Sequence, residues 1–214
     1  MARLQSRLLV PTVLRPFGEH LAAIVEPQPG DVCVDVGHQE SVMAPLLARL
    51  ARECIAVDDP DGLLRLPDGS AQVVTSLFAL AEQRDPAAVL GEMMRILDPQ
   101  HGRLAVALWS EPAAVPHLDA LTPANPQSVE EATRFGFPLA ADHLAEQAGA
   151  ADRLQVSRIH DVVRFDGTAH WWAAVGALAD ERHRAECQLR LQPYTAADGT
   201  LRIPTEAVVL TINS

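Results

Sequence analysis

Short apolar runs alternate with longer amphipathic stretches through the first half of the chain. Four of these runs are rich in valine, alanine or leucine and are bounded by glycine, aspartate, proline or serine. Runs of this length and composition are typical of strands that are buried on both faces. They predict strands at 31–37, 54–57, 73–77 and 104–109.

The amphipathic stretches between the runs repeat their apolar residues at helical spacing. They predict one helix before the first strand, near 17–25, and two more at 43–53 and near 86–97. The helix near 86–97 also has a clear beginning. Asp85 is a good N-cap residue, and Pro86 suits the first helical turn because its missing N–H has no intrahelical partner there.

The pattern changes after residue 110. Four prolines fall within 111–126, which predicts an irregular insert or a broken helix. Helical spacing returns at 139–149 and 170–190, and strand-like runs occupy 154–165 and 202–212. Strands that alternate with helices, followed by a strand-rich end, predict an α/β sandwich. Its sheet has about six strands and is mostly parallel, with an antiparallel hairpin at the C-terminal end.

Composition places the chain among globular proteins. Its 214 residues are 48% hydrophobic and 21% charged, which is enough to bury a sizeable core and excludes a disordered chain. We expect a single domain. In it, residues 1–30 form N-terminal helices, 31–109 the core, 110–150 an insert or cap, and 151–214 the closing strands and helix.

The expected location is the cytoplasm. No stretch is long and apolar enough for a transmembrane helix, and the first residues lack the apolar core of a secretion signal. The three cysteines, Cys33, Cys54 and Cys187, are too few for a disulfide framework. They suit a reducing compartment.

Charge narrows the choice of partners. The net charge is -11, and all 17 basic residues are arginines. Without lysine the chain has no Schiff-base chemistry and no P-loop lysine. An acidic surface repels the phosphate backbone, so nucleic acid is not an expected partner. Small molecules and other proteins remain, and no membrane partner is expected.

Six segments, taken in order along the chain, resemble one enzyme superfamily. They are residues 29–37, 55–58, 66–70, 89–97, 102–109 and 198–211. Together they resemble the class I S-adenosylmethionine-dependent methyltransferases, and among these the type 11 group that includes the ubiquinone/menaquinone C-methyltransferases. The resemblance implies a Rossmann-like fold, S-adenosylmethionine as cofactor, and the sheet order 2-1-4-5-7-6 in the family's strand names.

The loop after the first strand departs from the family pattern. The family places three glycines there, and only Gly37 remains, because Gln39 and Ser41 occupy the other two positions. Glu40 adds a negative charge near the place of the cofactor's methionine carboxylate. The repulsion is on the order of 3 kcal/mol at ~5 Å with an effective dielectric of about 20. Pro45 removes an N–H from the start of the next helix.

A deletion follows the second strand. Only seven residues separate Asp59 from Pro67, where the family has a helix and a further strand. Seven residues cannot hold both, so the sequence predicts that this helix and the family's third strand are missing. The segment 54–57 then becomes a sheet edge, and one wall of the adenine pocket is lost with the deleted strand.

The resemblance supplies candidate cofactor-binding residues, namely Asp35, Gly37, His38, Asp58 and Ser76. Asp58 is placed for the ribose hydroxyls, although the acids before Pro60 also suit an ordinary turn. Asp35 is equally explained as a structural acid that anchors the loop. His38 is the candidate catalytic base, with a solvent-facing loop histidine as the alternative. No metal site is expected, because His38 and Glu40 have no further partner of ligand type.

Three tryptophans are candidates for a substrate cavity, namely Trp109, Trp171 and Trp172. Two adjacent tryptophans on one helix cannot face the same way. One of them therefore packs in the core, and the other is expected either at the rim of the core or along a cavity or subunit interface. His101, His117 and His160 belong to no motif.

Two functional hypotheses follow. The first is a divergent methyltransferase-fold protein that has lost the usual S-adenosylmethionine binding. Such a pseudoenzyme would bind a small molecule or a partner protein, or catalyse a cofactor-free reaction in the old cleft. The second is a working methyltransferase in small-molecule metabolism. The unprotected edge at 54–57 further predicts a homodimer, or a monomer if residues 60–66 cover that edge.

Overall fold

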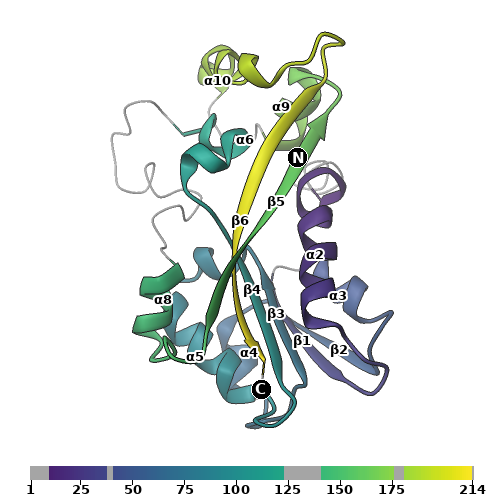
Figure 1. Ribbon diagram of the computed structural model, residues 1–214, viewed down its shortest axis with the longest axis vertical. Coiled ribbons are helices and arrows are strands. Elements are labelled where there is room, and N and C mark those ends of the chain that lie inside the picture. The colour runs from purple at the N-terminus through teal and green to yellow at the C-terminus, as the bar shows by residue number, and fades with distance from the viewer. Residues whose placement is uncertain (1–9, 38–40, 123–140, 176–180, 214) are drawn as a thin grey trace. The chain divides into compact units, whose positions relative to one another are not determined.

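The computed structural model describes residues 10–37, 41–122, 141–175 and 181–213 (Figure 1). The strands of this part of the chain form one sheet in the order β2-β1-β3-β4-β6-β5. They are β1 (Val32–Val36), β2 (Glu53–Val57), β3 (Val73–Leu77), β4 (Arg103–Trp109), β5 (Gln155–Phe165) and β6 (Leu201–Asn213). The order confirms the one that the resemblance implies.

The first four strands are parallel and in close register. Asp35 on β1 lies opposite Ala56 on β2 and Thr75 on β3, and Ser76 lies opposite Val106 on β4. β6 and β5 complete the sheet as an antiparallel pair. Because β1, β2 and β3 run the same way, the residues that follow them gather at one edge, where open α/β sheets bind ligands.

The chain divides into two compact units. The larger unit comprises residues 17–108, 139–159 and 207–214, and the smaller unit comprises 1–16, 109–138 and 160–206. The boundary crosses β5 and β6. The expected single domain stays a prediction.

Helix α5 (Pro86–Ile96) begins as the sequence predicts and covers one face of the sheet in the larger unit. The side chain of Asp85 accepts a hydrogen bond from the amide of Ala88 (3.0 Å), and Pro86 occupies the first turn. The buried stripe Leu90, Met93 and Ile96 joins the apolar core with residues from β1, β3, β4 and α8 (Ala141–Gln147).

Two other helices are shorter than the sequence predicts. Helix α3 is confined to Met43–Leu47, and Leu50, expected on its buried face, is 49% exposed. The helix cannot continue because the amides of Arg52 and Glu53 bind the carbonyl of Asp31, which brings the chain into β2. The helix expected at 170–190 is broken into α9 (Thr168–Val175) and α10 (Arg184–Arg190), and residues 176–180 lie outside the described part.

The connection between β2 and β3 contains a short helix and no strand. Helix α4 (Pro60–Leu64) starts at Asp59, whose carboxylate accepts from the amide of Gly62 (3.0 Å). The missing strand is therefore confirmed, because all residues of this connection are described and β2 forms the sheet edge. The expectation of no helix is wrong. Aspartate followed by proline caps a single helical turn, and a single turn needs only five residues.

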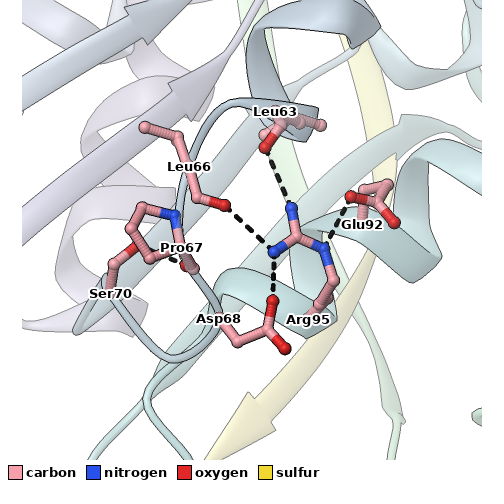
Figure 2. A network of polar contacts seen from close by, with 7 residues as sticks. All are labelled: Leu63, Leu66, Pro67, Asp68, Ser70, Glu92 and Arg95. Atoms are coloured by element: carbon pink, nitrogen blue, oxygen red, sulfur yellow. Dashed lines mark hydrogen bonds and ion pairs between the residues drawn. The ribbon is translucent and has the colours of Figure 1, made fainter.

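Arg95 holds this short connection against α5 (Figure 2). Its guanidinium donates to the carbonyls of Leu63 and Leu66 (3.0 Å each), and it also pairs with Asp68 and with Glu92. The guanidinium carries five N–H donors in a planar fork and serves four acceptors here, more than the three donors of a lysine ammonium could serve. The connection therefore takes a fixed course although it is too short to add a strand to the sheet.

The smaller unit is built from short helices, residues 160–165 of β5 and residues 201–206 of β6. The elements not yet named are η1 (Val10–Leu14), η3 (Pro112–Ala114), α6 (Pro116–Asp119), η5 (Glu181–His183) and η6 (Gln192–Tyr194). Two of the four prolines at 111–126 start η3 and α6, and the other two lie outside the described residues. Helix α2 (Arg15–Val25) begins in this unit, and η2 (Leu80–Glu82) belongs to the larger one. None of the described helices is both long and apolar enough to span a membrane.

Candidate functional site

Asp35 lies at the centre of the candidate site, near the carboxyl end of β1. Its side chain is buried, and one carboxylate oxygen accepts a hydrogen bond from the hydroxyl of Thr75 (2.9 Å). The other oxygen accepts from the hydroxyl of Ser41, and the amide of Ala44 also binds this carboxylate. Asp35 thereby ties β1 to β3 and to the loop that leads into α3.

Burial raises the pKa of Asp35 above its ordinary value. The three hydrogen bonds from Ser41, Thr75 and Ala44 favour the charged form and work against this rise, while the nearby charge of Asp58 adds to it. These contacts are those of an acid that anchors a loop. Binding of a cofactor by Asp35 stays a prediction.

The side chain of Ser41 lies beside Gly37. A Cβ atom on Gly37 would lie 3.5 Å from the hydroxyl of Ser41 and 3.6 Å from the carboxylate of Asp35. The same hydroxyl accepts from the amide of Met43 (3.0 Å), at the start of α3. The side chain of Ser41 therefore has an internal structural role. His38, the candidate base, lies outside the described residues with Gln39 and Glu40.

The two acids after β2 have different environments. Asp59 caps α4, whereas Asp58 is exposed at the carboxyl end of β2. The amide of Gly37 donates to the carbonyl of Val57 (3.0 Å), so β1 and β2 stay paired up to this edge. Asp58 is therefore presented to solvent at the carboxyl-terminal edge of the parallel strands, and its binding of a ribose stays a prediction.

The end of β3 adds two features to this edge. The hydroxyl of Ser76 is buried and has no hydrogen-bond partner among the described residues. Phe78 adopts a left-handed backbone conformation with φ 60°, which is strained for a bulky side chain. Its ring packs edge-on against Phe17, with the ring centres 5.5 Å apart. Sequence analysis missed Phe78, because no turn residue marks the position.

The tryptophans lie in the smaller unit and are more buried than expected. Trp171 is fully buried and its indole N–H donates to the carbonyl of His117 (3.1 Å). Trp172 is also buried and donates to Glu181 (2.9 Å), while the guanidinium of Arg184 lies over its ring. The contacts described for these two rings are with protein groups, and their role in a substrate cavity stays a prediction.

Trp109 is half-buried and packs edge-on against His117, with the ring centres 5.5 Å apart. The Nδ1 atom of His117 is 3.1 Å from the hydroxyl of Thr205, which itself donates to the carbonyl of Ile203. Burial lowers the pKa of His117 to about 3, so this ring is neutral. Nothing in the sequence around His117 indicates that this histidine is buried and neutral.

A pocket of about 340 Å³ opens in the smaller unit. Its walls come from η3, α6, β5, η6 and β6, and they include His160 and Glu206. Sequence analysis missed this pair, because the two residues are far apart in the chain and meet only through the strands that carry them. Within the described residues no three histidine, cysteine, aspartate or glutamate side chains gather as a metal site.

Comparison with known proteins gives a result for structure but not for sequence. No protein-family model matches the chain, and no curated protein matches it significantly. Among solved structures, a "putative methyltransferase from antibiotic biosynthesis pathway" of Anabaena variabilis is similar at TM-score 0.62. The two sequences are 17% identical, and the match covers 96% of this chain and 98% of that one.

Two further structures are similar over most of this chain. One is the complex between the Haloferax volcanii Trm112 methyltransferase activator and a "putative methyltransferase", at TM-score 0.54 and 16% identity. That match covers 100% of this chain and 95% of the other. The second is Haemonchus contortus phosphoethanolamine N-methyltransferase 2 with S-adenosylhomocysteine, at TM-score 0.55 and 10% identity, covering 93% of this chain and 52% of that one.

Proposed function

We propose that this chain, which has the fold of the class I S-adenosylmethionine-dependent methyltransferases, no longer binds S-adenosylmethionine in the usual way and serves as a small-molecule binding protein or a partner subunit. A cofactor-free reaction in the old cleft belongs to the same proposal. Membership of the type 11 group and a cytoplasmic location stay predictions.

The observation that carries the proposal is the sheet edge at β2. In the family, the strand beyond this edge ends beside the adenine of the cofactor. Here the chain passes from β2 through the single turn of α4 to β3, and β2 has no outer neighbour among the described strands. The strand that would supply one wall of an adenine pocket is therefore absent from the described sheet, which supports the proposal.

The cluster around Asp35 supports the same proposal. A cofactor that approaches the backbone at Gly37 needs open space there. The side chain of Ser41 lies beside this position and is bonded to both Asp35 and the start of α3. The residues that would receive the ligand are thus bonded to one another.

Calorimetric titration tests the proposal directly. We expect neither S-adenosylmethionine nor S-adenosylhomocysteine to release measurable heat at ligand concentrations up to about 1 mM, which corresponds to a binding free energy weaker than about -4 kcal/mol. The absent strand beside β2 and the Ser41 side chain beside Gly37 should each weaken the binding of this cofactor, and the two changes are independent of each other. Micromolar binding of either compound would refute the proposal.

The second candidate function is a working methyltransferase that acts on a small molecule. Three observations favour it, namely the exposed Asp58 at the end of β2, the strained backbone at Phe78, and the S-adenosylhomocysteine bound by the Haemonchus contortus neighbour. Saturable binding in the calorimeter that weakens in the Asp58→Asn variant and not in the Asp59→Asn variant would select this function.

We also propose that the chain forms a homodimer through the β2 edge. Leu50 and Leu64, which lie on either side of β2 in the chain, are 49% and 64% exposed. An apolar edge strand between exposed leucines favours association, and a two-fold dimer is the commonest closed form. The structurally similar protein from Haloferax volcanii forms a complex with an activator protein. A different protein bound at the β2 edge is therefore the alternative to a second copy of this chain.

Light scattering at micromolar concentration separates these states. We expect a mass twice the 23.1 kDa of one chain. The Ala56→Lys variant places a charge on the exposed edge and should shift the protein toward monomer, whereas Ala48→Lys, an exposed change outside β2, should leave the mass unchanged. A wild-type mass of 23.1 kDa that stays constant on concentrating would exclude the dimer.

A further inference from the structure

The pocket of the smaller unit is lined by a largely buried carboxylate. Glu206 on β6 lines the pocket, and its side chain is only 13% exposed. One of its oxygens accepts a hydrogen bond from the hydroxyl of Ser110, and the other lies 3.3 Å from Nδ1 of His160 on β5. These two neighbours fix the carboxylate in position, while His160 itself is 72% exposed at the rim.

The other lining residues are largely apolar. Asp161 also lines the pocket, and its carboxylate accepts a hydrogen bond from the amide of Val162 (2.6 Å). Pro116, Val162 and Pro204 provide apolar contact surface, and Tyr194 provides an aromatic ring. A carboxylate beside apolar walls is poorly hydrated, so it attracts a positive charge more strongly than a carboxylate in bulk water.

From this arrangement we propose that the pocket binds a small organic cation, with a substituted ammonium group against Glu206 and a short apolar body against the proline and valine walls. Tyr194 adds a ring face of the kind that binds ammonium groups. A volume of about 340 Å³ lies at the lower end of the range for small-molecule pockets, which limits the ligand to roughly the size of one ring.

Tyr194 makes the pocket directly observable, because it is the single tyrosine of the chain. Protein labelled with fluorotyrosine gives one fluorine NMR signal, and that signal reports from the pocket wall. Titration with benzylammonium should move the signal saturably. Benzyl alcohol should bind less tightly, since it lacks the charge, and benzoate should leave the signal in place.

Two variants locate the binding. Glu206→Gln keeps the shape of the side chain and removes the charge, so benzylammonium should bind at least about tenfold more weakly. Glu186→Gln removes one exposed negative charge from α10 in the same unit, outside the pocket lining, and should leave the affinity unchanged. Equal weakening in both variants would refute a specific site.

A third variant covers the case in which Glu206→Gln fails to fold. Ala113→Leu fills the pocket and keeps every charge, so it should abolish the response to benzylammonium. The proposal is refuted if benzylammonium gives no saturable shift, if benzoate binds equally well, or if Ala113→Leu binds as wild type does. The titrations contain no S-adenosylmethionine, so their outcome is independent of the proposed function.

Discussion

Replacing Trp171 with alanine is expected to lower the free energy of unfolding by about 3–5 kcal/mol, which is the usual cost of removing a large buried aromatic ring. The indole is fully buried in the smaller unit, and its N–H donates to the carbonyl of His117. Alanine leaves both a cavity and a buried carbonyl without that donor. Urea unfolding followed by circular dichroism measures the change.

Two further variants separate the contributions at this position. Trp171→Phe keeps an aromatic ring and removes the donor, so we expect a smaller loss, about 1–3 kcal/mol. Leu189→Ala on α10 removes a side chain that is 61% exposed and should change stability by no more than about 0.5 kcal/mol. If Trp171→Ala unfolds at the same urea concentration as Leu189→Ala, the ring does not stabilise the unit.

The elements that the sequence predicts well have strong local signals. The strand at 31–37 appears as β1 because a β-branched run ends at a glycine, and α5 starts at Asp85 because the capping residue and the following proline act locally. The deletion after Asp59 is also local, since seven residues cannot contain a helix and a strand. The order of the strands in the sheet follows once these elements are matched to those of the methyltransferase family that the chain resembles.

The errors lie where distant residues decide the structure. Helix α3 ends early because β2 must start opposite Val32, and the amides at 52 and 53 bind Asp31. Apolar spacing alone predicts continuation through Leu50, and the pairing that prevents it involves residues about 20 positions away. Helical spacing at 170–190 likewise gives no indication of the break between α9 and α10.

The candidate site was predictable only in part. The resemblance identifies Asp35, Asp58 and Ser76, and the register of β1, β2 and β3 brings them to one edge of the sheet. The bond between Asp35 and Ser41 is invisible in the sequence, because it depends on how the loop folds back. The strain at Phe78 and the pairing of His160 with Glu206 depend on tertiary structure in the same way.

The second large effect is expected at Asp35. Asp35→Ala removes the acceptor of three hydrogen bonds, and the hydroxyls of Ser41 and Thr75 and the amide of Ala44 lose that partner. We expect a loss of about 3 kcal/mol in the free energy of unfolding. Asp35→Asn keeps one acceptor oxygen and should cost less. Asp152→Asn, an exposed change in the same unit, is the control and should have little effect.

The pH dependence of unfolding tests which protonation state of Asp35 the folded protein favours. Burial raises the pKa of Asp35 above its ordinary value of 3.8, so the folded protein binds this proton more tightly than the unfolded chain does. The contribution of this proton to the free energy of unfolding is complete below pH 3.8, and it is lost as the pH rises through the folded-state pKa of Asp35. The stability of wild type relative to Asp35→Asn should therefore fall with rising pH across this window. A difference that stays constant or increases with pH would show that Asp35 is held mainly as a stabilised anion.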